Sequence, residues 1–571
     1  MYEIKISVRN LVEFIMRSGD LSVSSTGLKD ANAMQEGTRI HKKLQRKAGA
    51  GYHAEVALSH TSEVTYDGLT FRITVEGRAD GIYSDELGWN IDEIKGIYRD
   101  IHTLSEAIPV HRAQALCYGL IYALQHTLDG IGIRITYCHI PTQEVRYFHE
   151  FISFAELQNW YDTLLASYAK WASWQIRWQE ERNNNIKSLE FPFSYRDGQN
   201  TLVKGVYQSI LRKKRLYIEA PTGVGKTIST IFPAVKSLGE NVSEKIFYLT
   251  AKTITRTVAE DTLFLLQEKK VPLKSVTLTA KEKICFLEKP ACNPAQCDYA
   301  KGHFDRVNDA VFDLLTHETI MTRETILEYA KKHMVCPFEM ALDTATWCDF
   351  IIGDYNYAFD PTASLKRFFS VDKENNFVFL IDEAHNLVSR ARDMYSASLT
   401  KEDFLAMKKL VKVRSRRVAN ALDGCNRALL ELKRSCDELE KFDFLETESL
   451  VLKLMRLSTI MEEFFQEQEH PHPSFPTTPL PPSDKEQLLN FYFEIRSFQN
   501  IYELVDEHYI IYGDYTSDGH FVLHLQCMDP SANLDLYLKK SRCSVFFSAT
   551  FLPIHYYREQ LAGREDDYAI Y

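Results

Sequence analysis

The sequence predicts a multidomain α/β protein organised around a phosphate-binding loop. A short apolar run at residues 216–218 is typical of a buried strand, and a Gly-containing loop follows it. A second apolar run at residues 378–381 ends in the carboxylates of Asp382 and Glu383. The first 180 residues also alternate strand-like and helix-like runs. Strands that end in such a loop and in such acids are typical of a nucleotide-binding α/β sheet.

The loop after residues 216–218 has the composition of a phosphate-binding loop. Its backbone N–H groups and the dipole of the helix that follows would hold a triphosphate. Lys226 would reach the β- and γ-phosphates, and Thr227 would hold Mg²⁺. The first position is Ala220, where the general pattern has Gly. The expected contacts to the nucleotide are Ala220, Pro221, Thr222, Gly223, Val224, Gly225, Lys226 and Thr227.

The second apolar run supplies the partner of this loop. Asp382 at its end would hold Mg²⁺, Glu383 would orient the hydrolytic water, and His385 would couple the nucleotide to neighbouring motifs. Upstream of the loop, the amide of Gln199 could pair with the donor and acceptor edge of adenine. A third apolar strand ends in the run from Ser548 to Thr550. The sequence therefore predicts an ATP hydrolase.

Bulk properties are those of a globular protein. The chain has 571 residues, 45% hydrophobic and 25% charged, which predicts about three to four domains. Its net charge of −11 argues against a uniformly basic nucleic-acid-binding surface, although a local basic channel is compatible with it. With no long apolar run and no signal-peptide pattern, the sequence predicts a cytoplasmic protein without a membrane partner.

A second group of polar residues lies in the first 180 residues. Asp80 and Glu93 offer hard oxygen ligands suited to Mg²⁺ or Mn²⁺, and His41 could add a nitrogen ligand. Glu93 and Lys95 alternate along a predicted strand, so they share one face, where one holds a metal and the other orients the attacking water. Asp92 is the alternative to Glu93, but it points to the opposite face from Lys95.

Four cysteines between residues 280 and 340 have loop-like spacing. Eleven cysteines in a long chain do not indicate a disulfide framework, but thiolates at these intervals suit zinc or an iron–sulfur cluster. Spacing alone leaves both groups open. Cys348 is an alternative to the last of the four, although it lies beside an apolar run and is expected to be a core thiol. The expected metal ligands are Cys285, Cys292, Cys297 and Cys336.

The N-terminal pattern resembles the RecB-type PD-(D/E)XK nucleases. The matching segments are Gly37 to His41, Gly77 to Asp80, Glu93 to Lys95, and Gln114 to Tyr118. The resemblance implies a metal-dependent deoxyribonuclease domain at residues 1–182. It implies catalytic roles for Lys95, Glu93, Gln114 and Tyr118, and metal ligation by His41, Asp80 and Glu93.

The remaining motifs resemble those of XPD/DinG-like superfamily 2 DNA helicases. They are the phosphate-binding loop, the box Asp382-Glu383-Ala384-His385 and the run Ser548-Ala549-Thr550. This resemblance implies that Gln199 contacts adenine and that the four cysteines bind a [4Fe–4S] cluster. It implies a RecA-like domain at residues 190–280, 346–395 and 516–571, interrupted by a cluster insertion at 281–345 and a helical arch at 396–515.

Both resemblances together predict an ATP-dependent DNA helicase with a nuclease domain, acting in repair or on branched and single-stranded DNA. The sequence ends at Tyr571, soon after Thr550, which leaves no room for a second RecA-like domain. We therefore expect either a fragment or a separate chain that supplies that domain. Two alternatives stay open: an ATP-dependent DNA-clamping protein with an inert nuclease site, and a zinc-containing NTPase that acts on RNA.

Overall fold

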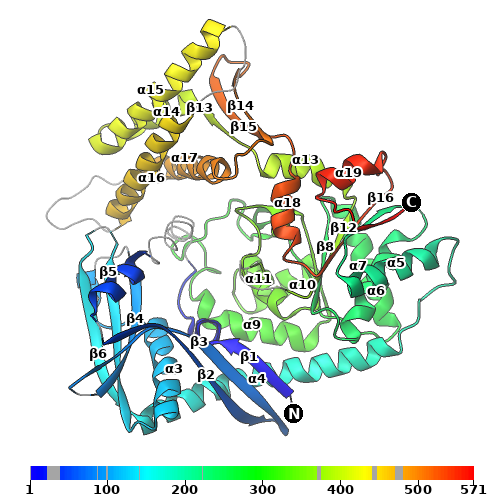
Figure 1. The fold of residues 1–571 in the computed structure, drawn as a ribbon, viewed down its shortest axis with the longest axis horizontal. Coiled ribbons are helices and arrows are strands. Elements are labelled where there is room, and N and C mark those ends of the chain that lie inside the picture. The colour runs from blue at the N-terminus through cyan, green and yellow to red at the C-terminus, as the bar shows by residue number, and fades with distance from the viewer. Residues whose placement is uncertain are drawn as a thin grey trace. The chain divides into compact units, whose positions relative to one another are not determined.

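The structure is a computed structural model, and its chain divides into two compact units. Unit 1 comprises residues 1–182, 280–318 and 324–347, and unit 2 comprises residues 183–279, 319–323 and 348–571. Figure 1 labels the elements of both units. The residues that the structure describes are 2–21, 39–49, 51–86, 88–97, 101–140, 142–221, 223–369, 375–439, 447–469 and 480–571.

Unit 1 is built on a mixed six-stranded sheet. Its strands are β1 (Tyr2–Ser7), β2 (Tyr52–Tyr66), β3 (Leu69–Asp85), β4 (Gly88–Ile97), β5 (Gly130–His139) and β6 (Val145–Ser153). The long β3 pairs in parallel with β1 and antiparallel with both β2 and β4. β4 then runs parallel to β5, and β6 returns antiparallel to β5. A central strand flanked on both sides can bring residues from three strands to one place.

Helices complete the N-terminal part of unit 1, among them the three that follow. They are α1 (Val8–Met16), α3 (Pro109–His126) and α4 (Phe154–Lys187). Ser7 caps α1 by accepting a hydrogen bond from the Asn10 N–H at 3.1 Å. Pro109 stands at the first position of α3, which its fixed φ favours, and Thr127 ends that helix in a left-handed conformation. α3 packs on the sheet through a wholly buried stretch from Ala113 to Ala123.

The cysteine-containing insertion belongs to the same unit. It carries α8 (Lys281–Ile284), α9 (His303–His317), most of α10 (Arg323–Lys332) and α11 (Pro337–Trp347). An aromatic cluster joins it to α1 and α4: the ring centroids of Trp171 lie 4.7 Å from Trp347 and 5.0 Å from Phe312. Phe14 packs 5.4 Å from Trp347 on the other side. Trp171 and Trp178 of α4 are thus core residues, 4% and 9% exposed.

Polar contacts run beside this aromatic cluster. Arg17 forms an ion pair with Asp343 at 2.8 Å, and its Nε donates to Asn308 at 3.1 Å. Backbone bonds continue along the chain: Leu21 N–H donates to the Ala300 carbonyl at 2.8 Å. The insertion is therefore fixed to the N-terminal part by apolar, ionic and main-chain contacts together.

Unit 2 is built on an eight-stranded parallel sheet. Its strands are β7 (Leu216–Glu219), β8 (Lys245–Leu249), β9 (Ser275–Thr277), β10 (Ile320–Met321), β11 (Phe350–Gly353), β12 (Phe377–Asp382), β16 (Cys543–Ser548) and β17 (Tyr568–Ile570). Their order across the sheet is β10-β9-β11-β8-β12-β16-β7-β17. Parallel sheets are covered on both faces, which is why the central strands are continuous apolar runs.

Helices cover this sheet. α5 (Gln199–Arg212), α6 (Lys226–Gly239) and α7 (Thr253–Glu268) pack on one face, over a core that includes Ile218, Tyr248 and Leu380. On the other face, Phe247 and Phe379 lie in an aromatic cluster with Phe369. The alternation of Phe247 and Tyr248 between the faces follows from the two-residue period of a strand.

The described residues between 396 and 527 form helices and a small antiparallel sheet. The helices are α14 (Lys401–Val411), α15 (Arg416–Leu439), α16 (Glu448–Glu469) and α17 (Pro482–Tyr502). The strands are β13 (Ala397–Thr400), β14 (Tyr509–Tyr515) and β15 (Phe521–Cys527), in the order β13-β15-β14. The sequence predicted the helices but not the sheet, and β15 pairs here instead of in the parallel sheet. Alternating apolar residues on both sides of a Gly-containing turn were the missed hairpin signal.

Within the described residues, no helix is both long enough and apolar enough to span a bilayer.

Candidate functional site

The phosphate-binding loop, the Asp-Glu-Ala-His box and the Ser-Ala-Thr run meet at one edge of the parallel sheet. They follow β7, β12 and β16, which are neighbours and end at the same edge. Main-chain bonds tie them together: Ala220 N–H donates to the Ser548 carbonyl at 3.1 Å, and Ala384 N–H donates to the Phe547 carbonyl at 3.2 Å. The carboxyl edge of a parallel sheet is where α/β proteins bind their ligands.

Two glycines shape the loop before α6. Gly223 has φ +88° and Gly225 has φ +78°, a left-handed region that favours glycine. Lys226 follows as the first residue of α6, and its Nζ donates to the Ala220 carbonyl at 2.8 Å. Burial lowers the pKa of Lys226, whereas the acids Glu383 and Asp382 raise it. The described part of the loop thus has the expected shape; the predicted contact Thr222 lies outside the described residues.

Asp382 is a buried acid held by a tyrosine. The hydroxyl of Tyr248, on β8, donates to the Asp382 carboxylate at 2.6 Å, and Thr227 acts on the same hydroxyl and lowers its pKa. Burial raises the pKa of Asp382 to about 6, although the Tyr248 bond opposes the rise. Tyr248 therefore connects the two predicted Mg²⁺ ligands, one from each motif.

Glu383 and His385 connect the box to the Ser-Ala-Thr run. Glu383 has φ +49°, a conformation that is strained for a residue with a side chain. Its carboxylate lies 3.4 Å from Nδ1 of His385, and that nitrogen also contacts the Ser548 hydroxyl at 2.7 Å. Ser548 lies 3.3 Å from the hydroxyl of Thr550. This chain of contacts fits the coupling role predicted for His385.

Gln199 stands against the phosphate-binding loop. Its Nε2 donates to the Val224 carbonyl at 3.2 Å, and its Oε1 accepts from the Arg196 N–H at 3.0 Å. A Cβ on Gly225 would lie 2.8 Å from the amide nitrogen, so the contact needs glycine there. Each end of an amide has a second hydrogen-bonding position. The predicted adenine contact stays a prediction.

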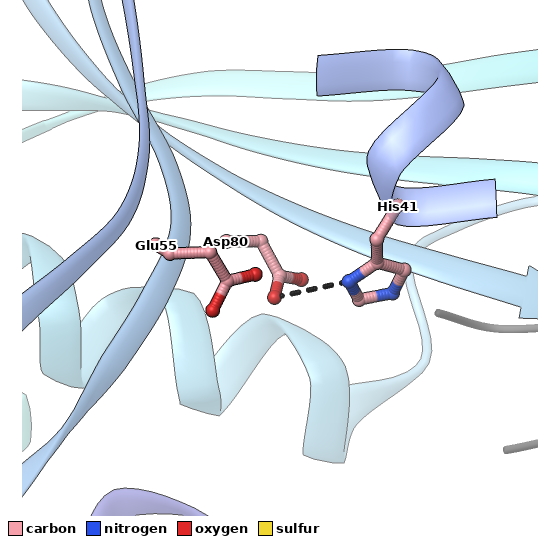
Figure 2. Close-up of side chains that lie close together, drawn as sticks. All are labelled: His41, Glu55 and Asp80. Carbon is pink, nitrogen blue, oxygen red and sulfur yellow. Dashed lines mark ion pairs between the residues drawn. The ribbon is translucent and has the colours of Figure 1, made fainter. Parts of the chain in front are cut away.

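The second group of polar residues comes together in unit 1. Asp80, on β3, accepts a hydrogen bond from the Ile94 N–H at 2.8 Å, and its other oxygen lies 3.3 Å from Nδ1 of His41. His41 stands on the helix at residues 39–47, and Gly37 lies outside the described residues. Figure 2 shows the carboxylates of Asp80 and Glu55 side by side, with the imidazole facing them. Burial opposes protonation of His41, but Asp80 raises its pKa overall.

Glu93 and Lys95 share one face of β4, as their spacing predicted. The Lys95 ammonium lies 2.7 Å from Oε1 of Glu93. Glu93 is only 4% exposed, and its Oε2 has no hydrogen-bond partner among the residues that the structure describes. Burial raises the pKa of Glu93 to about 7 against the opposing charge of Lys95, and Asp80 raises it further. A buried acid oxygen without a partner, beside a second acid, is suited to a cation.

Asp92, the alternative to Glu93, lies on the other face. Its carboxylate accepts hydrogen bonds from Arg134 at 3.0 and 2.7 Å and from the hydroxyl of Tyr52 at 2.9 Å. Thr136 is a further donor at 2.5 Å. Because four donor atoms already bind its carboxylate, Asp92 stabilises the packing of the sheet. The geometry therefore favours Glu93 as the acid of the candidate metal site.

Gln114 and Tyr118 lie on α3 behind this site. Gln114 is buried, and within the described part of the chain its Oε1 has no hydrogen-bond partner. The Tyr118 hydroxyl lies so close to Gly77 that a Cβ there would be 2.7 Å from it. Burial raises the pKa of Tyr118, and the charges of Glu93 and Asp80 raise it further. The catalytic roles predicted for both residues remain predictions.

The four predicted cysteine ligands differ from the other seven cysteines in exposure. All four are partly exposed, whereas the seven others, Cys348 among them, are buried. The thiols also act on one another electrostatically. Cys285 and Cys297 raise the pKa of the Cys292 thiol, and Cys292 raises the pKa of the Cys336 thiol. Burial raises the pKa of Cys336 to about 11. The structure thus brings the four thiols of unit 1 into one neighbourhood.

Two residues of these sites were missed by the sequence analysis. Tyr248 is the second residue from the end of an ordinary apolar strand, so no local signal marks its contact with Asp382. Glu55 lies in an alternating, exposed strand, where an acid is usually solvated. His41, Glu55 and Asp80 each offer a ligand atom, and these atoms lie within 4.8 Å of one another.

Comparisons with known proteins match part of the chain. Residues 250–404 match the family model DEAD_2. The Regulator of telomere elongation helicase 1 homolog of Caenorhabditis briggsae is 24% identical over 332 residues, which cover 49% of this chain and 33% of that protein. The General transcription and DNA repair factor IIH helicase subunit XPD/RAD3 of Saccharomyces cerevisiae is 27% identical over 197 residues, 34% of this chain and 22% of that protein.

Among solved structures, the chain is similar to one titled XPD_Helicase. The TM-score is 0.42 and the identity 16%, over 66% of this chain and 62% of the other. A similarity at that level adds nothing to the fold described above. The chain spans about a third or less of the length of the curated relatives named here.

We expect Asp92→Asn to weaken the fold of unit 1, because it removes the charge that neutralises the half-buried Arg134. The loss should be about 2–4 kcal/mol of unfolding free energy. Urea denaturation of the metal-free protein measures it. Glu93→Gln is the matched comparison and should stay within about 1 kcal/mol of the parent. Equal losses in both variants would contradict the division of roles between the two acids.

Proposed function

We propose that unit 2 is the first RecA-like domain of an ATP-dependent DNA helicase. The supporting observation is the buried Asp382, held by the Tyr248 hydroxyl at 2.6 Å, together with Lys226 at the start of α6. The DEAD_2 match over residues 250–404 includes the box and the strand before it. The relatives named above are helicases by title, which favours DNA as the polymer on which this chain acts.

The geometry suggests how ATP would be held. N–H groups at the start of α6 would bind the phosphates, and Lys226 would exchange its bonds to loop carbonyls for bonds to phosphate oxygens. Thr227 and Asp382 would hold Mg²⁺, which neutralises charge that develops on the phosphates. Glu383, fixed by its contact with His385, would orient the hydrolytic water. Gln199 would contact adenine.

A second RecA-like domain would complete this site from outside the residues described here. We propose that a separate polypeptide or a continuation of this one supplies it.

Single-stranded DNA would pass near a basic hollow of about 580 Å³ between α15 and α16, lined by Arg417, Lys453 and Arg456 among others. A cytoplasmic location remains part of the proposal.

We also propose that unit 1 is a metal-dependent deoxyribonuclease. The observation that supports it is the unpartnered, buried Oε2 of Glu93 beside Asp80 and His41. These three residues would hold Mg²⁺ or Mn²⁺, which supplies a Lewis acid for the scissile phosphate. Lys95, held at 2.7 Å by Glu93, would orient the attacking water, while Gln114 and Tyr118 would support the site from α3.

The four partly exposed thiols of the insertion supply the soft sulfur ligands that suit zinc or an iron–sulfur cluster. The resemblance to the XPD/DinG-like helicases favours the [4Fe–4S] cluster. We propose that Cys285, Cys292, Cys297 and Cys336 hold the cluster, whose bound form would stabilise the insertion.

Lys226→Ala should weaken ATP binding about tenfold or more, because the charged hydrogen bonds to phosphate are lost. Calorimetric titration with Mg²⁺ and ATP measures the affinity. Lys204→Ala, an exposed lysine on α5, is the control and should bind ATP as the parent does. Equal affinity of the Lys226→Ala variant and the parent would overturn the ATP site.

Lys95→Ala should reduce Mg²⁺- or Mn²⁺-dependent cleavage by about two orders of magnitude, because the attacking water loses its positioning group. Gel assays on matched DNA and RNA strands measure cleavage and identify the polymer. Lys47→Ala, an exposed lysine near His41, should cleave normally. If a clean preparation of the Lys95→Ala variant retains full cleavage, the assignment fails, and no cleavage by the parent would favour the DNA-clamping alternative.

Protein purified without oxygen should be brown, with an absorption band near about 400 nm and about four irons per chain. Cys336→Ser should lose most of that iron, because one thiolate ligand is replaced. Cys348→Ala removes a buried thiol, and this variant should retain the iron. Stoichiometric zinc in place of iron would support the zinc-containing alternative.

A further inference from the structure

The position of Glu55 relative to Asp80 is the starting point. In the antiparallel pair of β2 and β3, Ala54 pairs with Gly81 and Val56 pairs with Ala79. This register places Glu55 directly across from Asp80. Like charges directly opposite each other in a sheet are destabilising. A cation between the two carboxylates would turn this repulsion into attraction.

The backbone of Glu55 is unusual for a strand. Its φ is +55°, in the left-handed region, although the residues on both sides keep their pairing with β3. A residue with a side chain in that conformation is strained, and such strain is concentrated at functional sites. Its carboxylate ends beside Asp80, in front of the His41 ring (Figure 2).

The contacts of Glu55 leave room for a ligand. Its Oε1 accepts from Nε2 of Gln45 at 3.2 Å, and the same nitrogen donates to the Asp80 carbonyl at 2.9 Å. Its Oε2 lies 4.0 Å from Arg78, an exposed pair of little strength. Gln45 is one helical turn beyond His41, so the helix positions both the imidazole and the Glu55 carboxylate.

A second observation is an unsatisfied acid oxygen beside the cluster, on the carboxylate that Lys95 contacts only through its other oxygen. Oε2 of Glu93 is buried and accepts no hydrogen bond from any described residue, and both Asp80 and His41 act on that carboxylate. Asp80 therefore lies between an unsatisfied acid on β4 and an opposing acid on β2. His41 supplies the nitrogen ligand on the same side.

We propose that Glu55 is a ligand of the divalent cation at this site, together with His41 and Asp80. The proposal rests on the proposed nuclease function and adds a residue outside the sequence pattern that suggested it. A mixed set of imidazole and carboxylate groups suits Mn²⁺ at least as well as Mg²⁺. Glu55 and Glu93 thus set how tightly the site holds its metal, while Lys95 acts on the water.

Titration of the nucleotide-free full chain with Mn²⁺ alone tests the proposal, with free Mn²⁺ followed by electron paramagnetic resonance. Glu55→Gln should weaken binding by about tenfold or more. Glu63→Gln, an exposed acid on the same strand, is the matched control and should bind as the parent does. Parent-like affinity of Glu55→Gln would overturn the proposal.

Glu55→Gly separates a ligand from a structural residue. Glycine accepts the left-handed backbone, so the thermal midpoint of the metal-free variant should rise while Mn²⁺ binding falls. A lower midpoint together with parent-like Mn²⁺ binding would show a structural residue and overturn the proposal.

Asp80→Asn distinguishes failure of this proposal from failure of the nuclease assignment. If the metal site exists, Asp80→Asn should lose Mn²⁺ binding whether or not Glu55 is a ligand. Loss in Asp80→Asn with parent-like binding in Glu55→Gln would overturn the role of Glu55 alone. If the parent binds no Mn²⁺, or if Asp80→Asn binds it like the parent, the metal site of the nuclease fails, and the role of Glu55 fails with it.

Discussion

Burial of one acid in each unit, Asp382 in unit 2 and Glu93 in unit 1, is the constraint on which both candidate sites depend. Burial raises the pKa of Asp382 to about 6 and that of Glu93 to about 7, so each carboxylate is costly to keep ionised without a cation. Lys226 lowers the pKa of Asp382, and Lys95 contacts Glu93. Each ammonium offsets only part of the cost of ionising the buried acid. Both sites are therefore arranged to gain most from bound metal.

The two sheets deliver these acids by different routes. In unit 2, parallel strands end together, so β7, β12 and β16 bring three motifs to one edge by topology alone. In unit 1, the site depends on β3, which has β2 on one side and β4 on the other. Asp80 is thereby within reach of acids on two neighbouring strands. A hairpin partner, and not a motif at a strand end, supplies the additional carboxylate.

The sequence predicted those parts of the sites that local patterns encode. Alternation placed Glu93 and Lys95 on one face and Asp92 on the other, and the apolar runs located β7, β12 and β16. Contacts between strands far apart in the sequence had no such signal: Tyr248 reaches Asp382 only because β8 lies beside β12. Glu55 needed both the register with β3 and a left-handed backbone. The small sheet of β13, β14 and β15 was missed because a hairpin followed a long helical segment.

The division of the chain into units does not follow the family match. The DEAD_2 match covers residues 250–404 without interruption, yet residues 280–318 and 324–347 within it belong to unit 1. Trp347 and Phe312 of that insertion are covered by Trp171 and Phe14 from the N-terminal region. A chain that began at residue 183 would leave these rings facing water as an apolar patch prone to aggregation. Loss of the N-terminal region during evolution would therefore require compensating changes at Trp347 and Phe312.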